Sequence, residues 1–198
     1  ITPSGPDPTL GYIRRGAPLE GVTGAFAIDR FVEKPSVGDA EVLLAEGDAL
    51  WNSGMFVFAV ATVLDEAARV APELAAAVVR AFAAAAPSAP FAPPPELYAC
   101  VPAVAFDRAI MERSTLGAVV PCDLGWSDIG DWDRLGQASD RDAAGNALMG
   151  DGVVHNSRDN IVRTNGRLVA LAGVANMVVV ETRDAVLVAD RRDSAGVK

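Results

Sequence analysis

The spacing of apolar and polar positions changes along the chain. Residues 24–35, GAFAIDRFVEKP, follow the two-residue period of a strand that enters a loop at Pro35. Residues 39–47, DAEVLLAEG, carry an acid in the first turn, an apolar face and a closing glycine, which predicts a short helix. Residues 50–60, LWNSGMFVFAV, are aromatic and β-branched and predict a second extended element, interrupted by the NSG sequence in its middle.

Helical periods dominate the middle of the chain. Residues 62–86 predict a helix that is capped by Thr62 and divided at Pro72, since proline is tolerated in the first turn of a new helix. The proline-rich residues 87–100 predict a loop. Residues 104–114 predict a further helix, and a loop rich in Gly, Asp and Trp then leads into a helix that begins near Asp131.

Alternating strands and helices indicate an α/β layered domain with a buried sheet. Beyond Gly145 the helical period is lost, and short β-branched runs are separated by Asn, Asp and Gly. Repeated short strands with polar corners predict an all-β module, coiled as a solenoid-like stack. We therefore expect an α/β part at residues 1–143 and a β-rich C-terminal segment at residues 144–198.

Composition narrows the classes of function. The net charge of -9 argues against nucleic acid or an anionic membrane as the main partner, because both need a basic face. Any anionic substrate must therefore be bound by local positive charge, from one or two cationic side chains or from a metal ion. Cys100 and Cys122 have no metal-ligand spacing and fit a reducing compartment. Since the sequence also shows no bilayer-spanning run and no secretion signal, we expect a cytoplasmic protein without a membrane partner.

Lysine is rare here: of 17 basic residues only Lys34 and Lys198 are lysines. Lys34 lies in RFVEKP, where the predicted strand runs out. A lysine places a compact charge on a slim stem that can reach an oxygen in a narrow pocket, whereas arginine presents a flat fork. Taken alone, these six residues favour the ordinary solvated lysine of a strand end.

All three tryptophans lie in LWNSGMF and GWSDIGDW. Aromatic residues are usually core, but Asn52 and Gly54 interrupt an apolar run. An Asn side chain offers donors and an acceptor, and Gly permits close approach of a ligand or another backbone. A polyhydroxylated ligand is recognised by groups of this kind.

The GWSDIGDWD loop concentrates carboxylates, with Asp123 a little upstream. Clustered carboxylates after a strand suit Mg²⁺, which takes one or two of them and leaves the rest of its shell to water and phosphate oxygens. We assign Asp131 to the start of the following helix as a cap. Asp128, between Gly125 and Gly130, is the metal candidate.

Other candidates are weaker. His155 has no serine or cysteine motif nearby and favours a structural role, and Glu112 is expected on a solvated helix face. No G-x-S-x-G, H-E-x-x-H or Walker-type sequence occurs, which argues against a serine or zinc hydrolase.

The sequences RFVEKP, LWNSGMFVF, AIMERS and GWSDIGDW, in this order and spacing, closely resemble the bacterial mannose-1-phosphate guanylyltransferases, also called GDP-mannose pyrophosphorylases. GYI at residues 11–13 and the tail from residue 145 also fit, so the resemblance covers essentially the whole chain. It implies an α/β fold: part of a Rossmann-like, glycosyltransferase-A-like nucleotidyltransferase domain, followed by a left-handed β-helix segment.

The family's reaction transfers a guanylyl group from GTP to mannose-1-phosphate and releases pyrophosphate, with Mg²⁺ on the phosphates. By this resemblance Lys34 would bind the sugar phosphate, Glu33 would bind the sugar hydroxyls, and Asp128 would hold the metal; Lys34 and Asp128 would be the catalytic residues. The substrate-binding residues implied by the resemblance are Gly11, Glu33, Lys34, Asn52 and Gly54. The lysine of RFVEKP is then explained by a phosphate.

The chain also departs from the family pattern. The family's first half, with its G-x-G-T-R-L-type loop and its first metal aspartate, is missing, and Phe106 and Arg108 differ from the usual residues. We expect this chain to be a piece of a longer polypeptide and to be inactive alone. GTP would bind mainly to the missing half. The chain would contact that half or another chain, as in a homo-oligomer. The alternatives are a nucleotidyltransferase for another hexose-1-phosphate or nucleotide, and a non-catalytic sugar-phosphate-binding or regulatory homologue.

Overall fold

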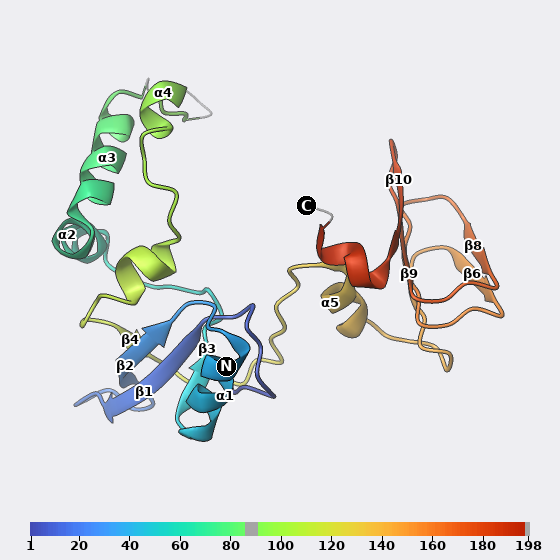
Figure 1. Ribbon diagram of the computed structural model, residues 1–198, viewed down its shortest axis with the longest axis horizontal. Coiled ribbons are helices and arrows are strands. Elements are labelled where there is room, and N and C mark those ends of the chain that lie inside the picture. The colour runs from blue at the N-terminus through green and yellow to red at the C-terminus, as the bar shows by residue number, and fades with distance from the viewer. Residues whose placement is uncertain (86–90, 197–198) are drawn as a thin grey trace. The chain divides into compact units, whose positions relative to one another are not determined.

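The computed structural model describes residues 1–85 and 91–196, which divide into two compact units, residues 1–126 and 127–198 (Figure 1). We describe each unit by itself. Within the described residues, no helix combines the length and the apolar character that crossing a bilayer requires.

The first unit is built on a four-stranded antiparallel sheet with the order β3-β1-β2-β4. Its strands are β1 (Tyr12–Pro18), β2 (Phe26–Val32), β3 (Ala49–Trp51) and β4 (Ala118–Val119). The predicted strand at residues 24–35 is confirmed as β2. The extended element predicted at residues 50–60 was wrong in its length, because regular pairing ends at Trp51. Strand β1 begins at Tyr12 and continues to Pro18.

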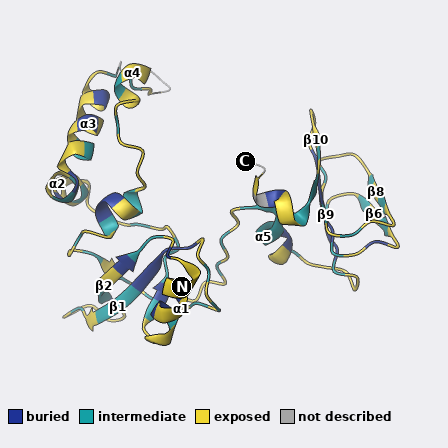
Figure 2. Ribbon diagram, in the orientation of Figure 1, coloured by how far each residue is buried: buried dark blue, intermediate teal, exposed yellow. Residues whose placement is uncertain are grey.

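Helix α1 (Val37–Ala45) packs on one face of this sheet. The Ser36 side chain accepts a hydrogen bond from the Asp39 N–H, so the helix begins two residues before its predicted start. Ala40 and Leu43 are buried against Tyr12. Figure 2 colours the ribbon by the burial of each residue. The opposite face of the sheet buries Ile13, Phe31 and Leu50.

The helices that follow form a separate layer. They are α2 (Val60–Val70), α3 (Pro72–Ala83), α4 (Pro95–Tyr98) and the π-helix η1 (Asp107–Met111). Pro72 begins α3 as predicted, but the predicted Thr62 cap is wrong, because α2 starts at Val60 after Ala59 without a side-chain cap. Residues 86–90, which include the start of the predicted loop at residues 87–100, lie outside the described part. Among the other residues of that loop, α4 is a short helix that was not predicted. The helix predicted at residues 104–114 is shorter and is a π-helix.

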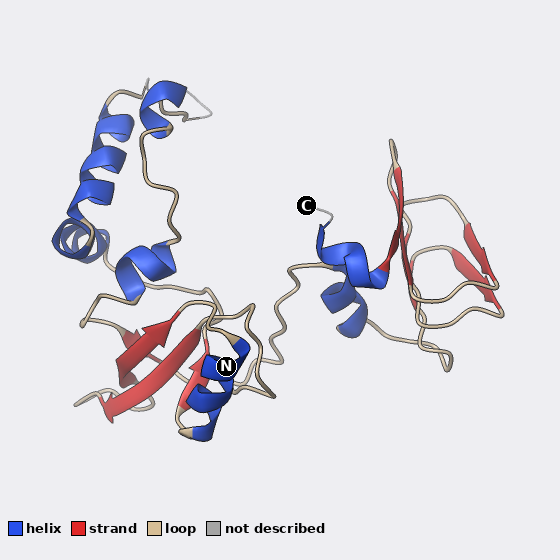
Figure 3. Cartoon of the chain, viewed as in Figure 1, coloured by secondary structure: helices blue, strands red, loops and turns tan. Residues whose placement is uncertain are grey.

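The second unit begins with α5 (Trp132–Gln137) and continues as strands until the 3₁₀-helix η2 (Arg191–Gly196) (Figure 3). Asp131 caps α5 by accepting a hydrogen bond from the Arg134 N–H at 2.8 Å, which confirms its predicted role. The strands are β5 (Ala147–Met149), β6 (Gly152–His155), β7 (Ile161–Arg163), β8 (Val169–Ala172), β9 (Met177–Glu181) and β10 (Val186–Asp190).

These strands stack as coils. β5, β7 and β9 pair in parallel, as do β6 and β8. β10 pairs antiparallel with β9 and forms the edge of the sheet that contains β5, β7 and β9. Inside the stack, the Asn146 Oδ1 accepts from the Asn160 Nδ2 at 2.9 Å, and the Asn160 Oδ1 accepts from the Met177 N–H at 3.0 Å. Each asparagine therefore satisfies backbone or amide groups of the next coil. The predicted all-β stack is confirmed, and its left-handedness stays a prediction.

We expect Asn160→Ala to destabilise the second unit. Asn160 is fully buried, and its loss leaves the Met177 N–H without a partner and removes one of the two hydrogen bonds that the Asn146 Oδ1 accepts, at a cost of about 1–3 kcal/mol for a buried polar group. Urea unfolding should show the loss, and amide exchange should place it in β7 and β9. Asn165→Ala, at an exposed position, is the control. Equal stability of the two variants would contradict the role of the ladder.

Glu66 and Arg69 form an ion pair within α2, and Ser114, which follows η1, also hydrogen-bonds to Glu66. Glu66, whose side chain is 7% exposed, accepts from the Arg69 Nη2 at 2.6 Å and from the Arg69 Nε at 2.9 Å. Hydrogen bonds from Arg69, and then from Ser114, lower the pKa of Glu66 from 4.5 to about 2. The ionised form is thus the one that the folded state favours.

This lowered pKa predicts a pH-dependent stability. Above pH 4.5 the Glu66 carboxylate contributes to stability, and the contribution is lost as the pH falls toward 2, because the unfolded chain takes up the proton first. Glu66→Gln should therefore lower the urea midpoint at pH 7, and the deficit should shrink on acidification between those limits. Glu41→Gln, on the exposed side of α1, should show no such trend. A deficit that is independent of pH would contradict this account.

Candidate functional site

Three of the predicted residues meet at one end of the first sheet. β1 pairs Tyr12 with Val32 of β2 and with Trp51 of β3, so the next positions, Gly11, Glu33 and Asn52, come together beyond the strand ends. A Cβ atom built on Gly11 would lie 2.6 Å from the Glu33 Oε2 and 3.2 Å from the Asn52 Cβ. Only glycine fits there without displacing the other two side chains.

Lys34 follows Glu33 in the sequence, and the backbone changes direction at this residue. Its φ of 50° is left-handed, which is uncommon for a residue with a side chain. Its Nζ lies 3.6 Å from the Glu33 Oε1; the lysine side chain is 59% exposed and the glutamate side chain only 11%. Burial, and then the charge of Asp107, raises the pKa of Glu33, while Lys34 opposes that rise. A solvent-facing ammonium therefore stands beside a largely covered carboxyl group.

Asn52 is held by two hydrogen bonds. Its Oδ1 accepts from the Gly54 N–H at 3.0 Å, and its Nδ2 donates to the Asp107 Oδ1 at 3.0 Å. Gly54 has a φ of 73°, a left-handed conformation for which glycine is suited. The predicted pair Asn52 and Gly54 thus forms one tight turn, and the second N–H of the Asn52 amide remains available to a ligand.

The π-helix η1 supports this cluster with residues that the sequence reading did not select. The Glu33 N–H donates to the Glu112 Oε1 at 2.8 Å, and the Arg108 Nη2 donates to the Glu33 carbonyl at 3.4 Å. Glu112 is exposed, as expected, but it is bonded rather than only solvated. Residues five apart share a side of a π-helix, whereas an α-helix would separate Asp107 from Glu112. A prediction based on the α-helical period therefore does not place Asp107 and Glu112 on the same side of the helix.

Asp128 belongs to the second unit. In its loop, Asp131 caps α5 and Asp133 pairs with Arg191. The side chain of Asp128 makes no hydrogen bond or ion pair with the residues that the structure describes. Among these residues, no three His, Cys, Asp or Glu side chains cluster as a complete metal site. A single carboxylate fits Mg²⁺ as one protein ligand, when water and phosphate oxygens complete the shell.

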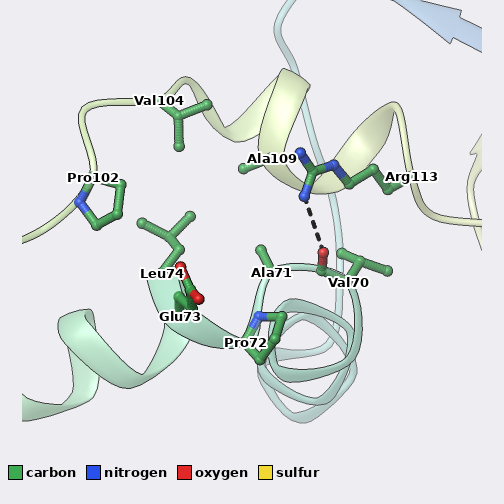
Figure 4. A pocket seen from close by; sticks show the side chains of 9 residues that line it. All are labelled: Val70, Ala71, Pro72, Glu73, Leu74, Pro102, Val104, Ala109 and Arg113. Carbon is green, nitrogen blue, oxygen red and sulfur yellow. Dashed lines mark hydrogen bonds between the residues drawn. The ribbon is translucent and has the colours of Figure 1, made fainter.

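A pocket of about 400 Å³ lies between the start of α3 and η1 (Figure 4). Its lining is mainly apolar, and the Arg113 guanidinium at its edge donates to the Val70 carbonyl at 3.2 Å. None of the predicted site residues lines it, so the cluster around Glu33 is the better candidate.

Comparison with known families supports the two-part reading. The Nucleotidyl transferase family matches residues 1–145, and the MannoseP isomerase/GMP-like beta-helix domain matches residues 150–198. The boundary between the two compact units lies instead between residues 126 and 127 of the sequence. The domain boundary at residues 143 and 144 stays a prediction.

Curated bacterial proteins match all or nearly all of this chain. A mannose-1-phosphate guanylyltransferase of Klebsiella pneumoniae is 40% identical over all of this chain, and the xanthan biosynthesis protein XanB of Xanthomonas campestris is 41% identical over 96% of it. The chain spans only 42% and 40% of their lengths.

A crystal structure from Thermus thermophilus, described as a mannose-1-phosphate geranyltransferase, matches with a TM-score of 0.76 and 32% identity, over 98% of this chain and 56% of its own. These findings confirm the resemblance drawn from the sequence. The chain belongs to the nucleotidyl transferase family, and the relatives that it matches over its whole length are mannose-1-phosphate guanylyltransferases.

Proposed function

We propose that the protein containing this chain transfers a guanylyl group from GTP to mannose-1-phosphate, giving GDP-mannose and pyrophosphate. This chain supplies the sugar-phosphate site. The observation that carries the proposal is the exposed Lys34 ammonium beside the converging Gly11, Glu33 and Asn52. A cation next to a carboxylate and an amide matches a ligand with a phosphate at one end and hydroxyls at the other.

Each group has a distinct task in this proposal. The Glu33 carboxylate accepts hydrogen bonds from sugar hydroxyls, and the unused Asn52 N–H donates to another sugar oxygen. Gly11 keeps the two side chains close, and Gly54 fixes the turn that aims Asn52. Together they fix the orientation of the sugar, so that its phosphate lies against Lys34.

The chemical step asks for positioning and charge neutralisation. A phosphate oxygen of the sugar attacks the α-phosphorus of GTP, the new P–O bond forms, and pyrophosphate leaves with the electrons of the broken bond. Lys34 reduces the repulsion between the two anions and is therefore both a binding and a catalytic residue. Mg²⁺, when bound, supplies further positive charge at the phosphates, and Asp128 is the residue proposed to hold it.

Replacing Lys34 in the longer protein tests this proposal. We expect Lys34→Ala to lower kcat/KM for mannose-1-phosphate by about 10²–10³-fold, the usual effect of losing one charge-stabilising group, and Lys34→Arg to restore only part of it. Release of pyrophosphate with GTP and Mg²⁺ is the measurement. Arg30→Ala, an exposed cation of β2, is the control and should keep full activity.

The outcomes separate the alternatives. Product only with another hexose-1-phosphate or nucleotide would keep the reaction and replace the substrate, and no product with any pair would favour a binding protein. The 198-residue chain alone should form no product, because its sequence has no G-x-G-T-R-L-type loop for the nucleotide. Activity of this chain alone would contradict the assignment of GTP binding to the rest of the protein.

Asp107 is proposed as a positioning residue, because it holds Asn52 and adds negative charge beside Glu33. In the longer protein, Asp107→Asn should raise KM for mannose-1-phosphate by about tenfold without raising KM for GTP, because the hydrogen bond from the Asn52 amide then goes to a neutral and weaker acceptor. Removing its charge should also lower the pKa of Glu33. The acid limb of kcat/KM should therefore move to lower pH.

A purely structural role would leave that acid limb in place. Asp65→Asn, on the exposed side of α2, is the matched control and should change neither KM nor the pH profile. An unchanged acid limb in the Asp107 variant, with KM raised for both substrates, would contradict the positioning role.

A further inference from the structure

Arg108 is a second cation at the cluster around Glu33, beside the lysine that the proposed reaction uses. The Arg108 Nη2 donates to the Glu33 carbonyl at 3.4 Å, while the Lys34 Nζ lies 3.6 Å from the Glu33 Oε1. The two cations therefore approach the same residue, one at its backbone and one at its side chain. Arg108 is exposed, and so is most of the Lys34 side chain. Both charges can thus reach a ligand that arrives from solvent.

The guanidinium of Arg108 is not neutralised by a neighbouring carboxylate. Among the residues that the structure describes, it makes no ion pair, although acidic side chains lie on the same π-helix and just after it. Asp107 instead accepts from the Asn52 Nδ2, and Glu112 accepts from the Glu33 N–H. The bond to the Glu33 carbonyl occupies one N–H group of the guanidinium, and the others remain available to a ligand.

The position of Arg108 is fixed by the element that carries it. The neighbouring Ala109 and Ile110 of η1 are buried in an apolar cluster of the helical layer. On the other side, Asp107 holds the Asn52 amide at 3.0 Å. The Arg108 side chain therefore leaves a fixed backbone directly beside the amide that is proposed to bind the sugar.

Both cations also act electrostatically on one carboxyl group. Burial, and then the charge of Asp107, raises the pKa of Glu33, and Lys34 and Arg108 both oppose that rise. The positive potential of the two side chains therefore overlaps at Glu33. A phosphate monoester suits such a place, because it carries close to two negative charges and three acceptor oxygens at neutral pH. A guanidinium can donate to two of these oxygens at once, and an ammonium adds a compact charge.

We propose that Arg108 binds the phosphate of the sugar phosphate together with Lys34, so that one phosphate group is held between a guanidinium and an ammonium. The inference rests on the proposed function and adds a second substrate-binding cation to it. Arg108 is one of the positions at which this stretch differs from the family pattern, so the resemblance does not imply this contact. The rival is a purely structural role, in which Arg108 only holds the Glu33 carbonyl.

Steady-state kinetics of the longer protein with GTP, Mg²⁺ and mannose-1-phosphate test the contact. At low salt, Arg108→Gln should raise KM for mannose-1-phosphate by about 10–100-fold, the usual effect of losing a hydrogen bond between charged groups. KM for GTP should not change. Arg108→Lys should recover part of the loss, because it keeps the charge without the fork.

Arg113→Gln is the matched control. Arg113 also donates one hydrogen bond to a backbone carbonyl, that of Val70, but it does so at the edge of the apolar pocket (Figure 4). Its replacement removes the same charge and the same kind of bond, and it should leave both KM values unchanged.

Salt separates a contact with phosphate from a structural role. The attraction between exposed charges is screened by salt, so the increase in KM caused by Arg108→Gln should shrink several-fold between about 0.05 M and about 0.5 M salt. An equal increase at both salt concentrations would assign Arg108 to the Glu33 backbone and would overturn the inference. An increase in KM for GTP of the same size would assign it to the nucleotide and overturn it too.

The Lys34→Ala variant distinguishes this inference from the proposed function. If Lys34→Ala lowers kcat/KM but Arg108→Gln leaves KM for mannose-1-phosphate unchanged, the proposed function stands and only the second cation is wrong. If the longer protein forms no product with any sugar phosphate, both fail.

Discussion

The candidate site depends on the register of one strand. β1 pairs antiparallel with β2 on one side and β3 on the other, and Tyr12 is opposite both Val32 and Trp51. This double pairing brings Gly11, Glu33 and Asn52 together although they are far apart in sequence. A slip of one residue would move Tyr12 out of its buried position against α1 and would separate the three groups. The hydrophobic core of the sheet therefore also sets the geometry of the site.

A second constraint comes from η1. Asp107, Arg108 and Glu112 bond to Asn52 or to the backbone of Glu33, while Ala109 and Ile110 of the same element are buried against Ala71. One short π-helix thus joins the apolar helical layer to the polar cluster at the end of the sheet. Because π-helical turns are uncommon and often lie at functional sites, this turn supports the candidate site independently of the family comparison.

Local patterns in the sequence were enough for β2, for the Asp131 cap and for the β-rich stack, because each is determined by residues close together in the chain. The selection of Glu33, Lys34 and Asn52 came from residue chemistry and family resemblance, and the structure brings them together. Glu112 was not selected, because its partner, the backbone of Glu33, lies 79 positions away. The extent of the strand after Trp51 was also mispredicted: its apolar pattern is that of a strand, but pairing needs a neighbour that no local pattern specifies.

The side chains around Glu33 carry charges of both signs. Lys34 and Arg108 bring two positive charges to it, while Glu33, Asp107 and Glu112 are three carboxyl groups, so the cluster is not cationic as a whole. A phosphate is attracted to Lys34 but is repelled by the carboxylates behind it, and the chain carries a net charge of -9. The carboxylates suit sugar hydroxyls, which donate hydrogen bonds, and disfavour a bare anion. For the proposed function, this charge pattern suits a ligand that is anionic at one end only and whose phosphate is bound together with a cation.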